Sequence, residues 1–389
     1  MRGIIACAAM AVGVWTGAAG AADSVKIGFM TTLSGPGGGL GAEMRDGMML
    51  ALKHANGKFG GLPTEIIVQD DQQKPDIGAQ IVDRFINRDK VQMITGTIFS
   101  NVLLPVVPTI LESGTFVISP NTGPERFAGA GCHPLFFATA FQNEDHSLVL
   151  GKLVSERGIG EVALIAPDYP GGRETLNGFK VGFKGKVVEE IYVKMGQPDY
   201  AAEIAQLRAA SPKAIFYFLP GGMGINFVRQ FTASGLNRTV PLYTHGGTAD
   251  EDVIKAVGEP MVGIYNSSQW TFELDNAANK KFMAEFQKEF SRRPSMFAAI
   301  GYDTGMLLDA AIRQSGGKIE DKAAFGKALK NVKFDSVRGN FRFNNNQFPI
   351  QDYYLRQVVK NDAGVVLNKQ VSLIVKDYND RFNDQCKMN

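Results

Sequence analysis

The chain has 389 residues, of which 44% are hydrophobic, and its 41 Lys and Arg residues nearly balance 39 Asp and Glu residues, giving a formal net charge of +2. A chain of this length and composition buries a large core, most readily as two domains, which excludes a disordered protein. Because the charges balance and no long basic run is present, the sequence disfavours nucleic acids and other acidic macromolecules as partners.

The first residues differ from the rest of the chain. Arg2 precedes an almost wholly apolar stretch over residues 4–15, and the small residues Ala19-Gly20-Ala21 follow it. A positive start, a short apolar segment and a small-residue cleavage site are the parts of a secretory signal peptide. The alternative, a membrane anchor, needs about 20 apolar residues. We therefore predict that residues 1–22 are a signal peptide that is cleaved on export to the periplasm.

Removal of the signal leaves Cys132 and Cys386 as the cysteines of the mature chain. In an oxidising compartment such a pair is expected to form a disulfide, and the alternative is a pair of buried free thiols. Neither cysteine belongs to a C-x-x-C motif, and the 4 histidines lack the spacing of metal ligands. No metal site is therefore predicted.

Beyond the signal, short apolar runs alternate with segments of helical periodicity, which is the pattern of an α/β fold with parallel sheets. In the first half of the chain, helices are predicted over residues 40–54 and in the segment after Pro75. The strands predicted in this half are residues 25–31, 64–69, 91–97, 115–119 and 136–141.

The alternation then restarts, which indicates a second α/β unit. Its predicted strands are residues 161–166, 187–193, 214–219, 241–244 and 263–267. Its predicted helices are residues 174–183, 200–210, 223–234 and 250–257.

The last part of the chain predicts a return to the first unit. Helices are predicted here without strands between them, so they are expected to pack on the sheet of the first unit. The late β-like runs 353–359 and 371–375 are expected to join the sheet of the second unit. The predicted helices are residues 276–290, 295–314 and 321–330. The fold is therefore α/β, with two Rossmann-like lobes joined by a three-strand hinge. The predicted lobes are residues 23–141 plus 272–345 and residues 142–271 plus 346–389, with connections over residues 142–147, 266–276 and 340–347.

Ligands of open α/β sheets bind beyond the carboxyl ends of the strands. In this chain the residues at those ends are uncharged except for Asp168, and they include hydroxyl, amide and aromatic side chains. Such a cleft suits a small, partly apolar molecule that carries one carboxylate. The alternative at each position is a turn residue selected for its backbone geometry.

Catalytic motifs find little support. Gly37 to Ala42 fits the G-x-G-x-x-A pattern of dinucleotide sites, but the acidic residue expected about 20 residues further on is missing. The glycines instead indicate a flexible turn, or a helix N-terminus that offers N–H groups to a small anion. No serine lies in a nucleophile motif beside a plausible base, so no catalytic residue is predicted.

Several segments resemble a known family. VKIGFMTTLSGPGGGLG (residues 25–41), GLPTEIIVQDD (61–71) and GTIFSN (96–101) are similar to segments of type I periplasmic solute-binding proteins, above all the branched-chain amino-acid and amide branch. Further matches, spread over the mature chain, are residues 123–125, 168–172, 198–200 and 302–303. The resemblance implies a two-lobed clamp, not an enzyme, that delivers a solute to the membrane permease of an ABC transporter.

The resemblance also implies roles for single residues. Ser100 matches the serine that holds the ligand carboxylate, Thr122 matches a threonine that contacts both ligand ends, and Tyr169 matches a tyrosine of the opposite lobe. Phe297 matches an aromatic pocket wall, and Leu40 replaces a tyrosine of the amino-acid binders. The full set of predicted ligand-binding residues is Leu40, Phe99, Ser100, Asn101, Asn121, Thr122, Tyr169, Pro220, Gly221, His245, Gly246 and Phe297.

The chain departs from the amino-acid binders at Gly246, where they resemble one another in carrying a glutamate that pairs with the ligand ammonium. An unpaired ammonium in a closed cleft costs about 3 to 5 kcal/mol, so an α-amino acid is disfavoured. The segments GCHP (131–134) and LPGGMGIN (219–226) resemble a sub-branch that binds aromatic acids.

We therefore expect a benzoate-, hydroxybenzoate- or cinnamate-like ligand for a monomeric periplasmic protein that has an ABC permease as partner and no cofactor. The alternatives are a branched-chain amino-acid or amide binder and a ligand-sensing protein.

Overall fold

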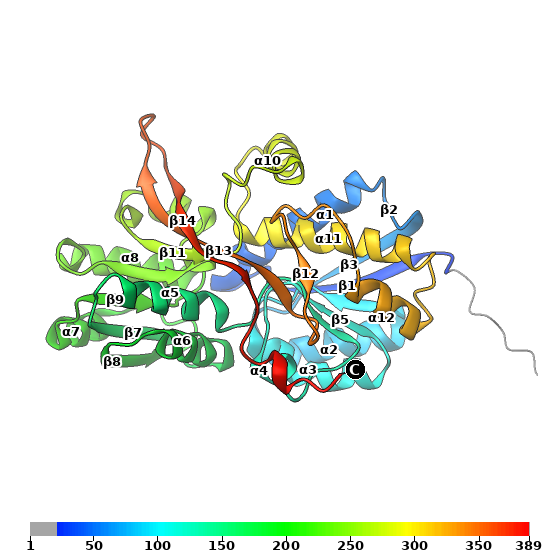
Figure 1. The fold of residues 1–389 in the computed structure, drawn as a ribbon, viewed down its shortest axis with the longest axis horizontal. Coiled ribbons are helices and arrows are strands. Elements are labelled where there is room, and N and C mark those ends of the chain that lie inside the picture. The colour runs from blue at the N-terminus through cyan, green and yellow to red at the C-terminus, as the bar shows by residue number, and fades with distance from the viewer. Residues whose placement is uncertain (1–21, 389) are drawn as a thin grey trace, which may run out of the picture.

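The computed structural model describes residues 22–388. The predicted signal peptide lies outside the described residues, apart from Ala22. Two α/β lobes lie side by side, one built on the early strands and the other on the later ones (Figure 1). Among residues 22–388, no helix combines the length and the apolar character needed to cross a membrane.

The first lobe contains a six-stranded sheet in the order β2-β3-β1-β4-β5-β6. Its central strand β1 pairs in parallel with β3 and β4, and it is buried along nearly its whole length, as its continuous apolar sequence predicts. The strands are β1 (Val25–Thr31), β2 (Lys58–Phe59), β3 (Leu62–Asp70), β4 (Met93–Thr95), β5 (Phe116–Ser119) and β6 (Phe136–Ala138). The early helices are α1 (Gly38–His54), α2 (Pro75–Arg84), α3 (Ser100–Glu112) and α4 (Glu125–Ala128).

The second lobe contains a sheet in the order β13-β11-β10-β9-β7-β8, with β14 paired to β13, and the short β12 of the first lobe pairs with the start of β13. Strands β7 to β11 run in parallel, whereas the late strands are antiparallel and form a long hairpin that projects from the lobe (Figure 1). The strands are β7 (Glu161–Pro167), β8 (Lys186–Val193), β9 (Ala214–Tyr217), β10 (Leu242–His245), β11 (Tyr265–Ser268), β12 (Arg342–Phe343), β13 (Pro349–Lys360) and β14 (Val366–Tyr378). The helices are α5 (Asp145–Glu156), α6 (Pro170–Gly182), α7 (Ala201–Ala210), α8 (Gly222–Ala233) and α9 (Glu251–Val257).

Three late helices, α10 (Ala277–Phe290), α11 (Met296–Gln314) and α12 (Lys322–Lys330), follow the second crossing. Helix α11 packs against α1 of the first lobe (Figure 1). Two glycines make this contact close, because a β-carbon on Gly47 would lie 2.0 Å from the carbonyl oxygen of Ala298, and one on Gly301 would lie 2.1 Å from that of Met44. Short helical turns are η1 (Gly35–Gly37), η2 (Phe85–Asp89), η3 (Leu236–Arg238), η4 (Gly246–Thr248), η5 (Glu259–Met261) and η6 (Asn383–Gln385).

Three helices, α3, α4 and α5, are not among the predicted ones. The interior of α3 contains Pro105 and Pro108, residues that normally end helices. Residues 142–147 are predicted to form a connection, although α5 already begins at Asp145. The polar start of α5 is buried because it lies where the lobes meet, so its polarity does not indicate an exposed loop.

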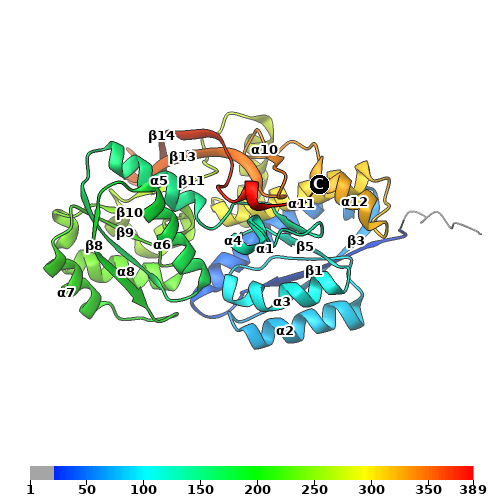
Figure 2. The same ribbon diagram turned by 60° about the horizontal axis from the view of Figure 1, so that its bottom comes forward.

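Besides the three predicted connections, the tail after β14 runs back to the first lobe (Figures 1 and 2). Phe382 belongs to the hydrophobic core of that lobe. Nδ2 of Asn346 donates to the carbonyl oxygen of Ala128 and to Oδ2 of Asp380, both at 2.8 Å. We therefore propose the predicted lobe boundaries with one correction, which moves residues 346–348 and 380–388 from the second lobe to the first.

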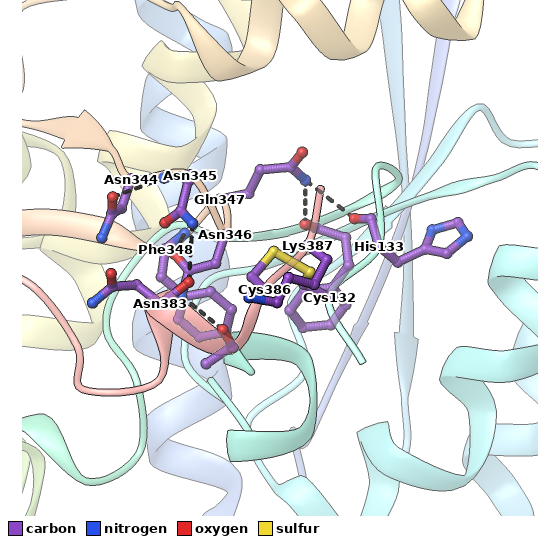
Figure 3. The surroundings of a disulfide bond; sticks show 12 residues. Cys132, His133, Asn344, Asn345, Asn346, Gln347, Phe348, Asn383, Cys386 and Lys387 are labelled. Carbon is purple, nitrogen blue, oxygen red and sulfur yellow. Dashed lines mark hydrogen bonds between the residues drawn. A yellow bond between two sulfur atoms is a disulfide. The ribbon is translucent and has the colours of Figure 1, made fainter. Parts of the chain in front are cut away.

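A disulfide fixes this tail. Cys132 and Cys386 are bonded at an S–S distance of 2.08 Å, which confirms the predicted pairing. Figure 3 shows the bond beside the loop that leads into β13, where Nε2 of Gln347 donates to the carbonyl oxygen of His133 at 3.2 Å. The tail, this loop and the segment around Cys132 thus form one bonded cluster on the first lobe.

Candidate functional site

A cavity lies between the two lobes, beyond the carboxyl ends of strands from both sheets, where open α/β folds bind ligands. The cavity is narrow, since the centres of water-sized spheres can occupy only about 30 Å³ of it. The lining residues are Leu40, Ile98, Phe99, Ser100, Asn121, Thr122, Phe141, Asn143, Tyr169, Gly171, Thr175, Phe218, Pro220, His245, Gly247 and Phe297.

Most of the predicted ligand-binding residues meet in this cavity. Three of them do not line it, namely Asn101, Gly221 and Gly246. Asn101 is the second residue of α3. Gly221 instead touches the other lobe, because a β-carbon there would lie 2.4 Å from the carbonyl oxygen of Pro36. The lining residues that the sequence analysis missed are Ile98, Phe141, Asn143, Gly171, Thr175, Phe218 and Gly247.

Gly246 faces away from the cavity, contrary to expectation. A β-carbon on it would lie 2.5 Å from the carbonyl oxygen of Ser267 and 3.2 Å from Nη2 of the buried Arg356. The chain turns at η4, so Gly247 is the residue that lines the cavity. A β-carbon on Gly247 would meet the Phe297 ring at 2.9 Å. This ring therefore fills the space that a longer side chain at 247 would need.

Neutral donors from both lobes face the cavity. Ser100 is the first residue of α3 in the first lobe, and Tyr169 is the N-cap of α6 in the second. The N-terminal ends of helices carry unpaired N–H groups and a partial positive charge, which stabilise anions. Among the described residues, those that line the cavity include no Asp, Glu, Lys or Arg. The lining thus offers an anion helix N-termini and neutral donors but no cationic side chain, and it offers an ammonium no carboxylate.

Aromatic rings form much of the remaining wall. The Phe99 and Tyr169 rings meet edge to face across the lobes, with centroids 6.3 Å apart. The His245 ring contacts Phe141 and Phe218 with centroid distances of 5.3 and 5.4 Å. Aromatic pairs favour such edge contacts, so these rings form a packed apolar wall.

His245 is a neutral donor at this wall. Its Nδ1 accepts a hydrogen bond from the Gly247 N–H at 3.0 Å, so the ring proton lies on Nε2. Burial, the neighbouring His146 and Arg356 hold the pKa of His245 well below its usual range. The imidazole therefore stays uncharged at neutral pH and offers a single N–H.

Asn121 and Thr122 are fixed by the strand ends. Nδ2 of Asn121 donates to the carbonyl oxygen of Ile98 at 2.7 Å, which ties the ends of β5 and β4 together. Ser119 donates to the carbonyl oxygen of Thr122 at 2.5 Å. Both residues thus lie on a rigid part of the first lobe.

The lobes touch closely beside the cavity. A β-carbon on Gly171 would lie 2.9 Å from the Tyr169 ring and 3.0 Å from Oγ of Ser100. Replacing Gly171 by Ala is expected to weaken ligand binding by about tenfold or more, because overpacking at this contact costs about 1 to 3 kcal/mol. The Tyr169 contact lies within the second lobe, so the melting temperature of the empty variant is measured as well, to separate a loss of stability from a loss of closure.

Calorimetry with wild-type protein and the Gly171→Ala variant tests this expectation. The lobes of a clamp close around their ligand, so small-angle scattering should show that the wild type becomes more compact when ligand is added. The variant should become compact to a smaller extent. Gly160→Ala is the matched control, since a β-carbon at that position meets no atom within 4 Å. An unchanged affinity of the Gly171 variant would show that the contact does not limit closure.

The family model of the periplasmic binding proteins matches residues 24–378 of this sequence. The chain belongs to this family. It is a periplasmic solute-binding protein of an ABC transporter, a class that serves transport and is not a class of enzymes.

Relatives of this periplasmic binding protein include amino-acid and aromatic-acid binders. The Leu/Ile/Val-binding protein homolog 6 of Brucella melitensis is 25% identical over 381 residues, covering 96% of this chain and 97% of the relative. A solute-binding protein of Rhodopseudomonas palustris, solved with benzoate, has a TM-score of 0.88 at 28% identity and covers 94% of this chain and 99% of its own. Another from the same species, solved with 3,4-dihydroxybenzoic acid, has a TM-score of 0.86 at 28% identity and covers 92% and 99%.

Proposed function

We propose that this protein binds a small aromatic carboxylate in the cavity between its lobes and delivers it to the membrane permease of an ABC importer. The main support for this proposal is the cavity lining, which combines neutral donors at helix N-termini with aromatic walls. Among the described residues, the lining contains no acidic side chain. The two relatives solved with benzoic acids support this ligand class. We further propose that the exported protein works as a monomer after cleavage of its signal peptide.

The rival ligand is a branched-chain amino acid, as the name of the Brucella relative suggests. Such a ligand brings an ammonium group, and burying it without an acidic partner costs several kcal/mol. The residues that line the cavity include the neutral His245 and several hydroxyl groups but no acidic side chain. An amino acid is therefore disfavoured relative to an aromatic acid of similar size.

A thermal-shift screen of the mature protein tests the proposal. Benzoate, 4-hydroxybenzoate and cinnamate are compared with leucine and valine at equal concentrations. A ligand at about 100 times its Kd stabilises the folded state by about 2.7 kcal/mol, which raises the melting temperature measurably. We expect at least one aromatic acid to do so and the amino acids to do so less. Equal or greater stabilisation by leucine would overturn the aromatic assignment and leave the transport role unchanged.

A further inference from the structure

Asn143 connects the proposed carboxylate-holding Ser100 to the opposite lobe. Its Nδ2 donates to Oε2 of Glu174 at 2.7 Å and to Oγ of Ser100 at 3.3 Å. Its Oδ1 accepts from the N–H of Gly123 at 2.8 Å. Because a backbone N–H is always a donor, this last bond fixes which end of the amide is oxygen. Both amide protons of Asn143 are thereby directed at Glu174 and Ser100.

The consequence falls on the Ser100 hydroxyl. Asn143 occupies an acceptor site on this oxygen, so the hydroxyl proton points elsewhere. Ser100 is buried and lines the cavity. Its proton is therefore available to a ligand oxygen that enters the cavity.

Glu174 holds Asn143 from the second lobe. It lies on α6, and its Oε2 also accepts from the N–H of Glu125 in the first lobe at 3.3 Å. Asn143 itself lies in the connection that leads into α5. The residues Ser100, Asn143 and Glu174 thus form a hydrogen-bonded chain, here called the relay. Glu174 comes within reach of the other two when the lobes close.

We propose that Asn143 and Glu174 are positioning residues for ligand binding, which orient the Ser100 hydroxyl as a donor to the ligand carboxylate once the lobes have closed. This inference rests on the proposed function insofar as Ser100 holds a carboxylate. Neither positioning residue was predicted from the sequence, and Glu174 does not line the cavity itself.

The protonation state of Glu174 is expected to make ligand binding depend on pH. Burial raises the pKa of the Glu174 carboxyl to about 7, helped by the nearby Glu125 and Glu144, whereas the bonds from Asn143 and the Glu125 N–H oppose this. Two arginines of this region are paired with other carboxylates, Arg381 with Glu144 at 2.7 Å and Arg173 with Asp168 at 2.7 Å. Tyr169, at the start of the same helix, is a neutral phenol whose pKa burial raises further.

A ligand carboxylate beside Ser100 adds another negative charge near Glu174 and raises its pKa again. Glu174 then takes up a proton as the ligand binds, and its carbonyl oxygen still accepts from Asn143. Because binding is coupled to uptake of this proton, the affinity for the ligand is highest at low pH, where Glu174 is already neutral. The affinity then falls as pH rises through a window that includes 7.

Calorimetry with benzoate on the full mature protein tests the relay. Asn143→Ala and Glu174→Ala should each weaken binding by about tenfold, the effect of losing one oriented hydrogen bond to a charged group. Glu174→Gln keeps the acceptor without the charge, so it should bind at least as tightly as wild type at pH 8. It should also lose part of the pH dependence. Glu251 and Asp252, whose pKa values burial raises to about 7 and 8, remain in every variant, so the comparison isolates Glu174.

A double-mutant cycle separates positioning from a general structural role. In a Ser100→Ala background, Asn143→Ala should have less than about a twofold effect, because the hydroxyl that it orients is gone. An undiminished effect there would overturn the relay, as would Glu174→Gln binding as weakly as Glu174→Ala. If benzoate fails to bind wild type and leucine binds, the proposed aromatic function fails. The cycle is then run with leucine, whose carboxylate should show the same coupling.

Discussion

Replacing both Cys132 and Cys386 by Ser is expected to lower the free energy of unfolding by about 5 kcal/mol. The bond joins residues separated by 254 positions, so its removal frees a very long loop in the unfolded chain. On the chain-entropy account, a loop of about 100 residues is already worth about 4.7 kcal/mol, and the gain grows only slowly with length. Urea unfolding of the oxidised wild type and the double variant measures the difference.

Reduced wild-type protein is the matched control, because it loses the bond without any substitution. It should unfold at nearly the same urea concentration as the double serine variant. Denatured, unreduced wild type should contain no titratable thiol in the mature chain. Two titratable thiols in that sample would contradict the bond itself.

Replacing Ser100 by Ala is expected to weaken binding of an aromatic acid by about 10- to 100-fold, because a hydrogen bond to a charged group is worth about 1.5 to 3 kcal/mol. Ser100 lines the cavity at the first turn of α3, and its hydroxyl proton is free of protein acceptors among the described residues. Calorimetry with benzoate measures the loss. The melting temperature of the empty protein should change little.

Ser155→Ala is the control for this substitution. Its hydroxyl donates to the carbonyl oxygen of Gly151 at 3.1 Å, one turn earlier in α5 and outside the cavity lining. The control should bind benzoate like wild type. A similar loss of affinity in both variants would point to an effect on folding and against a ligand contact at Ser100.

Much of the site could be predicted because it depends on a rule about strand ends. Ser100, Thr122, Tyr169 and His245 all follow or end strands whose apolar runs are evident in the sequence, and parallel strands bring their carboxyl ends to one edge. The same rule, applied further, would also have found Phe218, which directly follows β9.

The remaining differences depend on features that no local pattern carries. The sequence predicted that Gly246 lines the cavity, whereas Gly247 does so in the structure. The backbone turns at η4, so a shift of one residue decides which of the two faces the cavity. Asn143 acquires its role from Ser100 and Glu174, which lie 43 and 31 positions away in the sequence. Helix α3 was obscured by its two internal prolines, which lie on its exposed side.

The tail that returns to the first lobe makes the second lobe part of a covalent ring. All residues between Cys132 and Cys386 lie inside this ring. When the two ends of the oxidised chain are pulled apart, the disulfide carries the force and these residues are not stretched. The 254 residue steps from Cys132 to Cys386 would add about 850 Å of contour length if the chain between them could extend. Stretching single molecules should release this length only after reduction. By the same topology, one proteolytic cut within the ring leaves both fragments attached, so nicked protein still migrates as one species until the bond is reduced.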